Sequence, residues 1–129
     1  MHIIQEDKEL LFKDLCAMLP YNCRVFYEYI DDLDNKTYGY SLTLNTWCID
    51  EFIANKAVIK PYLRPMSSMT EEESKEFALL QTDFYVDGIL YPIAAINMIN
   101  WINAHHFDYQ GLIHKGLAIE VTEENNPYK

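Results

Sequence analysis

Basic residues are scarce in this sequence. Its 129 residues contain ten Lys and Arg against twenty Asp and Glu, which gives a formal net charge of −10 at pH 7. A negative field of this size repels nucleic-acid phosphates and anionic lipid headgroups, so we exclude a non-specific nucleic-acid binder and a membrane-surface protein. The deficit is greatest in the second half, where no Lys or Arg occurs between residues 82 and 114.

Cysteines, glycines and long apolar runs are also few. The three cysteines form no C-x-x-C pair, which is typical of free thiols in a reducing compartment. The four glycines are scattered, so the chain has no phosphate-binding loop, and we expect no cofactor. The most apolar stretch, residues 89–102, is interrupted by Asn97 and Asn100 and is too short to span a bilayer. The N-terminus does not resemble a secretory signal, so we expect a cytoplasmic protein.

The apolar residues that are present predict one α+β domain over residues 1–129. Half of the chain is hydrophobic and 14% is aromatic, which excludes a disordered protein. The periodicity predicts these elements: a helix at about 6–18, strands at 23–30 and 38–45, a short strand at 58–60, and helices at about 70–81 and 92–106. Residues 46–57 fit either a strand or a helical turn, and the tail from about residue 122 is expected to be loose. The expected architecture is a three- to four-stranded antiparallel sheet with three helices packed on one face.

Two local patterns support these elements. Apolar and polar residues alternate from Tyr38 to Asn45, as in a strand with one solvated face. Thr70 and Glu73 have the spacing of a capping box, in which each side chain bonds to the other residue's backbone N–H at the start of a helix.

The histidine-rich run at residues 105–114 contains the strongest candidates for a catalytic or metal-binding site. His105, His106 and Asp108, with His114 nearby, are candidates for a metal site or for a catalytic base and its orienting group. Adjacent helical residues point about 100° apart, however, whereas helical metal ligands lie three or four residues apart. The favoured interpretation is therefore that the histidines end a helix and Asp108 caps the next segment, and we expect no metal.

Two groups of residues are candidates for an interaction surface. In the last predicted helix Asn97, Asn100 and Asn103 lie opposite six apolar residues, so they either face a partner or find hydrogen bonds within the fold or with water. Tyrosine is abundant, with ten in the chain, and four of them lie on the predicted hairpin: Tyr27, Tyr29, Tyr38 and Tyr40. Such residues suit a half-buried sheet as well as an interface.

Two runs resemble a known family. They are K-P-Y-L-R-P-M-S-S-M-T-E-E-E at residues 60–73 and W-I-N-A-H-H-F-D-Y at residues 101–109. Both are similar to runs in a family of small proteins, without an assigned function, from gut Bacteroidetes genomes and their phage and prophage-like elements. The resemblance implies a bacterial or phage-encoded protein that is located in the bacterial cytoplasm, and it implies no activity.

Three functions are compatible with the sequence. The leading hypothesis is a non-enzymatic acidic module that binds another protein, with a basic partner favoured by the charge, as a phage or mobile-element accessory protein. The first alternative is a small hydrolase or metal-binding enzyme that uses the run at His105, His106 and Asp108. The second is a nucleic-acid mimic whose carboxylates occupy a DNA-binding partner.

Overall fold

The computed structural model describes residues 3–82, 85–86, 89–90 and 92–129 and has a mixed α and β architecture. The elements follow in this order: α1 Gln5–Met18, β1 Arg24–Ile30, β2 Thr37–Thr43, α2 Thr46–Ile53, β3 Val58–Pro65, α3 Glu71–Thr82, β4 Tyr85–Val86, β5 Ile89–Leu90, α4 Pro92–Ala104, β6 Phe107–Asp108 and β7 Ile119–Glu120. The predicted α+β class is confirmed. In the described ranges no helix combines the length and apolarity needed to cross a membrane.

The sheet is antiparallel from β2 through β1 to β3 and parallel only where β6 and β7 pair with β3. β1 pairs antiparallel with β2 from Arg24↔Thr43 to Ile30↔Thr37, and antiparallel with β3 from Val25↔Pro61 to Glu28↔Val58. The short strands β6 and β7 run parallel to the second half of β3. The prediction of a wholly antiparallel sheet is therefore wrong in this detail. β6 and β7 have two residues each, which is too short for a period-two pattern to reveal them.

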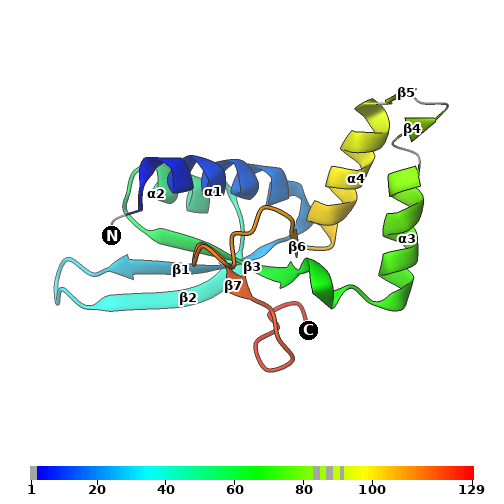
Figure 1. Ribbon diagram of the computed structural model, residues 1–129. Coiled ribbons are helices and arrows are strands. Elements are labelled where there is room, and N and C mark those ends of the chain that lie inside the picture. The colour runs from blue at the N-terminus through cyan, green and yellow to red at the C-terminus, as the bar shows by residue number, and fades with distance from the viewer. Residues whose placement is uncertain (1–2, 83–84, 87–88, 91) are drawn as a thin grey trace.

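Two helices, α1 and α2, cover one face of this sheet (Figure 1). α2 lies in the segment for which the sequence pattern fitted either a strand or a helical turn. Its N-cap Asn45 accepts a hydrogen bond from the Cys48 N–H at 3.0 Å. The main core lies between these helices and the sheet. It includes Leu11, Leu15, Met18, Cys23, Val25, Cys48, Phe52, Ile59 and Leu63.

The other two long helices, α3 and α4, do not cover the sheet. They form an antiparallel pair that projects from the sheet as an arm, with the β4–β5 hairpin at its tip (Figure 1). The expectation that helices at 70–81 and 92–106 pack on the sheet is therefore wrong, although both helices exist. Periodicity shows which face of a helix is apolar, but it does not show which element that face contacts.

The base of the arm is held by Arg64 at the end of β3. Its guanidinium binds the Glu73 carboxylate through two hydrogen bonds of 2.8 and 2.6 Å, and it lies 4.2 Å from the centre of the Phe107 ring. Glu73 also accepts from the Thr70 N–H at 2.9 Å, while Thr70 Oγ1 accepts from the Glu73 N–H at 3.1 Å. The predicted capping box is confirmed. One carboxylate therefore both starts α3 and ties it to the sheet.

The C-terminal tail is fixed by Tyr128. Its hydroxyl accepts from the Arg24 N–H at 3.0 Å and donates to the Tyr62 carbonyl at 2.8 Å. Arg24 and Tyr62 would be the next pair of the β1–β3 ladder after Val25↔Pro61, so the hydroxyl bridges the two strands where they separate. The expectation of a loose tail is thus wrong at Tyr128, because the hydrogen bonds of a single half-buried tyrosine anchor the tail despite the polar composition around it.

We expect Glu73→Ala to lower the free energy of unfolding by about 2 kcal/mol, because it removes charge-assisted hydrogen bonds and a helix cap together. Arg64 holds the pKa of Glu73 at about 2, below its ordinary 4.5. The difference between wild type and variant should therefore be full above pH 4.5 and shrink as the pH falls towards 2. Urea unfolding at several pH values measures it. Glu72→Ala, an exposed change on the same helix, is the control. Equal effects of the two changes would contradict this role of Glu73.

We expect Tyr128→Phe to lower the free energy of unfolding by about 1–3 kcal/mol, since the Arg24 N–H and the Tyr62 carbonyl both lose their partner. Hydrogen exchange at the Arg24 amide should become faster. Tyr40→Phe is the matched control, because Tyr40 is 44% exposed. Unchanged exchange at Arg24 in Tyr128→Phe would show that the bridge does not form.

Candidate functional site

The histidines of the 105–114 run have separate partners. His105 Nδ1 lies 2.8 Å from the Trp101 carbonyl oxygen, and its ring centre is 4.2 Å from that of Trp101. His106 has a φ of +61° and points its Nε2 at the Tyr21 carbonyl oxygen, 2.8 Å away. His114 is exposed. The run therefore does not gather its imidazoles around one point.

His106 is a structural contact between the tail and the sheet. Its ring stacks on Tyr128 with centres 4.1 Å apart and planes 8° from parallel. The carbonyl of Tyr21 is an acceptor, so Nε2 carries the hydrogen. Burial lowers the pKa of His106 below its ordinary value, which favours the neutral ring.

Asp108 caps the following segment, as the favoured interpretation expects. Its two carboxylate oxygens accept hydrogen bonds from the backbone N–H groups of Leu112 and Ile113, at 2.8 and 3.0 Å. In the described part of the chain, no group of three or more His, Cys, Asp or Glu side chains is placed to hold a metal ion.

The sequence analysis missed a buried carboxyl group, Asp14 on α1. Asp14 is 2% exposed, and its Oδ1 accepts from Gln110 Nε2 at 3.1 Å, while its Oδ2 has no hydrogen-bond partner among the described residues. Burial, and then the negative charge of Asp108, raise the pKa of Asp14 to about 7. A signal was available, because Asp14 lies between Leu11 and Met18 on the apolar stripe of its helix.

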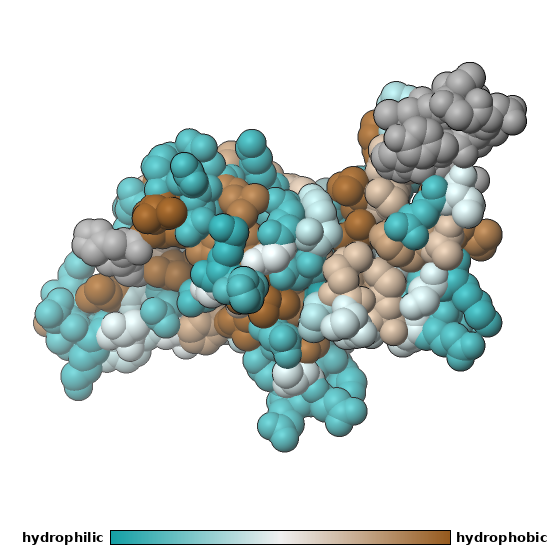
Figure 2. All heavy atoms as spheres, in the orientation of Figure 1, coloured by the Kyte–Doolittle hydropathy of each residue, from teal (hydrophilic) through white to brown (hydrophobic). Residues whose placement is uncertain are grey.

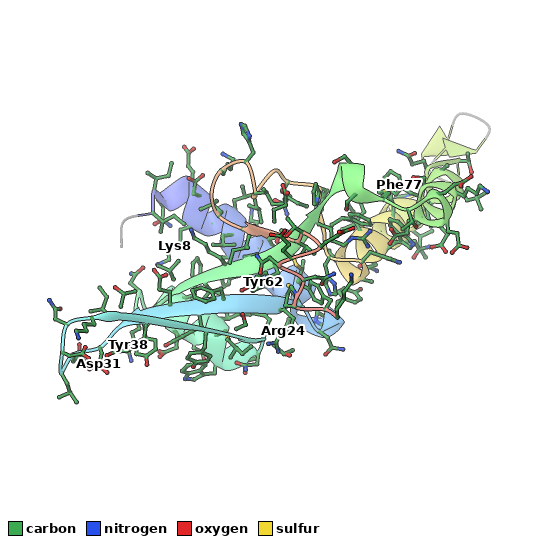
Figure 3. All side chains as sticks on the ribbon, turned by 90° about the horizontal axis from the view of Figure 1, so that it is seen from below. Lys8, Arg24, Asp31, Tyr38, Tyr62 and Phe77 are labelled. Carbon is green, nitrogen blue, oxygen red and sulfur yellow. The ribbon has the colours of Figure 1, made fainter. Side chains whose placement is uncertain are left out.

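The four tyrosines share the sheet face that α1 and α2 cover. Tyr27 is 5% exposed, stacks on Trp47 at 4.8 Å and donates from its hydroxyl to Glu51 at 3.2 Å, so it belongs to the core and not to an interface. Tyr29 is half-buried beside Tyr38. Tyr38 and Tyr40 are 42% and 44% exposed, and Tyr38 lies where the hairpin extends past the helices (Figure 3). The tyrosines are thus mainly a cross-strand ladder that supports the hairpin.

The three asparagines of α4 have different environments. Asn97 and Asn100 are exposed, as the interface hypothesis requires. Asn103 is 2% exposed at the base of the arm, and its Oδ1 has no partner among the described residues. Because Asn103 lies close to the sheet, only Asn97 and Asn100 of the three asparagines are placed to face a partner. The position of Asn103 follows from how the arm joins the sheet, which helical periodicity does not show.

One side of α4 presents apolar residues to solvent. Ile93 is 69% exposed and Ile96 is 57% exposed, and with Asn97 and Asn100 they have the spacing i, i+3, i+4, i+7 along one face of the helix. The opposite face, which includes Trp101 and Met98, is half-buried against the rest of the protein. Figure 2 shows hydrophobic residues over α4 and hydrophilic residues at the start of α3, at the base of the arm. We call Ile93, Ile96, Asn97 and Asn100 the α4 stripe.

Acidic residues lie at the base of the arm, at the opposite end from Ile93 and Ile96. α3 has three consecutive glutamates in its first turn, Glu71–Glu73, followed by Glu76, and contains one base, Lys75. Glu76 accepts a hydrogen bond from Trp101 Nε1 at 2.9 Å, which ties the two helices together. α4 itself contains no charged residue. The arm therefore has an uncharged stripe on α4 and an acidic start of α3 at its base.

Comparison with protein-family models, with curated proteins and with solved structures finds no match. The resemblance of residues 60–73 and 101–109 to the Bacteroidetes and phage family therefore remains a prediction.

We expect Asp14→Asn to remove a pH-dependent destabilisation. Because the pKa of Asp14 is about 7 in the fold and 3.8 ordinarily, the folded state retains a proton that the unfolded chain releases. Wild type should therefore lose stability relative to the variant as the pH rises from about 4 to above 7, by at most about 4 kcal/mol. Urea unfolding between pH 5 and pH 8 measures this. Asp50→Asn, at an exposed position on α2, should leave the pH dependence unchanged. Parallel pH profiles for wild type and Asp14→Asn would refute the shift.

Proposed function

We propose that this protein is a non-enzymatic module that binds another protein through the α4 stripe. The observation that supports it is the exposure of Ile93 and Ile96, at 69% and 57%, on a helix without a single charged residue. A helix that is apolar on all sides is usually buried in a core or in a membrane. Here one side packs within the protein and the other is left for a partner.

The spacing of the stripe supports a helix that lies in a groove. Residues at i, i+3, i+4 and i+7 are the positions through which an amphipathic helix contacts a groove in another protein. Ile93 and Ile96 would enter the groove, and the amides of Asn97 and Asn100 would form hydrogen bonds beside them. Because Arg64, Glu73 and the Trp101–Glu76 contact already hold the helix in place, little conformational freedom is lost on binding.

Charge defines the chemistry of the partner. The chain has a net charge of −10, and no Lys or Arg occurs between residues 82 and 114, the segment that contains the stripe. A partner with an apolar groove bordered by Lys and Arg fits this surface, whereas a second acidic surface would be repelled. The resemblance to phage and mobile-element proteins supports a role as an accessory protein in a bacterial cytoplasm.

The test is site-specific cross-linking in bacterial cells, with a photoreactive residue in place of Asn97. We expect a single dominant cross-linked protein, and a residue placed at Leu33, which is 98% exposed in the hairpin loop, should not give it. With that protein purified, the double change Ile93→Ala and Ile96→Ala should weaken binding at least about tenfold, and Leu33→Ala should not. Affinity should fall as salt rises, because a basic rim faces acidic residues.

Three outcomes would overturn the proposal. They are cross-linking of equal yield from positions 33 and 97, unchanged affinity in the double variant, and a cross-linked species that proves to be a second copy of this chain. The last would assign the stripe to self-association, and sedimentation of the purified protein at several concentrations would detect it.

A further inference from the structure

The outer edge of β2 is open for pairing with another strand. β2 is an end strand of the sheet, and among the described strands it pairs only with β1. Its residues are exposed apart from Leu42, which is half-buried. Proteins commonly protect such an edge with charged side chains, proline or a bulge. β2 has none of these, because its sequence is Thr-Tyr-Gly-Tyr-Ser-Leu-Thr and all of its residues pair with β1 in one unbroken register.

Hydrogen bonds at the two ends of the hairpin show which backbone groups of β2 point outward. The Leu44 N–H donates to the Cys23 carbonyl at 2.8 Å, and the Asp31 N–H donates to the Lys36 carbonyl at 2.9 Å. Hydrogen-bonded and non-hydrogen-bonded pairs alternate along an antiparallel ladder, so the even-numbered residues of β2 bond to β1. The odd-numbered residues therefore point their N–H and C=O groups away from the sheet: Thr37, Gly39, Ser41 and Thr43.

We propose that the β2 edges of two copies of this chain pair antiparallel, about a two-fold axis at Tyr40. In this register Gly39 pairs with Ser41 of the second copy, and Thr37 pairs with Thr43. Every outward N–H and C=O group of β2 then has a partner, and each contact occurs twice because the interface is two-fold symmetric. A shift by two residues would leave an outward residue of each strand outside the pairing, so this register is the favoured one.

The side chains also match across the two-fold axis. On the face that carries the tyrosine ladder, Tyr40 meets Tyr40 of the second copy, and Tyr38 meets Leu42. Tyr38 and Tyr40 are 42% and 44% exposed, so their rings still have area to bury. Aromatic and aromatic–apolar pairs across strands are favourable, and the pair at the axis is of the non-hydrogen-bonded type, in which side chains lie closest.

Charge is compatible with two copies at this edge. Two chains of net charge −10 repel each other in general, but residues 37–43 carry no charge. The register brings the Thr43 end of one copy to the hairpin loop of the other. Arg24 stands at that end, since its Nη1 donates to Thr43 Oγ1 at 3.1 Å. The loop of the second copy offers it three aspartates against one lysine: Asp31, Asp32, Asp34 and Lys36.

Disulfide formation tests the register. The full chain carries Cys16→Ser, which removes the exposed thiol, together with either Tyr40→Cys or Tyr38→Cys. Two residues at the axis have Cα atoms about 4.5 Å apart, within the range of about 4.4–6.8 Å that a disulfide spans. We expect Tyr40→Cys to form a covalent dimer on mild oxidation. Tyr38→Cys has a similar exposure on the same face, but it faces Leu42 and should give at most about a tenth of that yield. Equal yields, or a higher yield from position 38, would overturn the register.

Sedimentation equilibrium of the full chain tests the edge. Ser41→Pro removes an outward N–H and leaves the bonds to β1, so the dimer dissociation constant should rise at least about tenfold. Ser41→Ala is the matched control, because it removes only the hydroxyl that lies 2.9 Å from the Tyr62 hydroxyl, and it should leave the constant unchanged. Wild type that sediments as a monomer up to about 1 mM would overturn the proposal. If Ser41→Pro does not fold, the yields from positions 38 and 40 decide.

The α4 stripe gives a separate control. The hairpin and the arm lie at opposite ends of the molecule (Figure 1), so pairing through β2 does not involve Ile93 or Ile96. The double change Ile93→Ala and Ile96→Ala should therefore leave the dimer dissociation constant unchanged, and a second copy held through β2 should give no cross-link from position 97. A dimer that the double change abolishes would overturn pairing through β2.

Discussion

The attachment of the arm depends on the Arg64 guanidinium. It binds Glu73 through two hydrogen bonds and lies over the Phe107 ring at 4.2 Å, so it joins α3, β3 and β6 at one point. Because Glu73 also completes the capping box of α3, the same carboxylate decides where the helix begins and where it is attached. Trp101 and His105 pack around this point and extend it to α4. Without this attachment α3 would have little to hold it to the sheet, since none of its residues is fully buried.

The protein therefore has two parts with different physical roles. In the sheet with α1 and α2, apolar side chains from both layers form a conventional core. The arm is secured mainly by an ion pair, aromatic contacts at its base and the Trp101–Glu76 hydrogen bond, and it leaves Ile93 and Ile96 exposed. A stable core that presents a pre-ordered helix is well suited to recognition of another protein.

Polar groups inside the protein have opposite effects on the stability of the fold. Asp14 lies in the apolar stripe of α1 with one oxygen unpaired, and the negative charge of Asp108 lies near enough to raise its pKa. Asp108 itself stabilises the following segment, because its two carboxylate oxygens accept from the Leu112 and Ile113 N–H groups. Tyr128 stabilises the fold, since its hydroxyl forms hydrogen bonds with two backbone groups, the Arg24 N–H and the Tyr62 carbonyl, where the strands separate.

The sequence alone determined the local elements: α1, the β1–β2 hairpin, the capping box of α3 and the two faces of α4, because periods of 2 and 3.6 residues and side chain–backbone caps depend on near neighbours only. It also predicted the capping role of Asp108. Tertiary structure alone decided where the elements lie: α3 and α4 project from the sheet and do not cover it, and β6 and β7 pair with β3. It also decided that Tyr27 and Asn103 are buried and that Tyr128 anchors the C-terminal tail. Each of these depends on contacts between residues far apart in the chain, such as Tyr128 with Arg24, and no local pattern encodes such a contact.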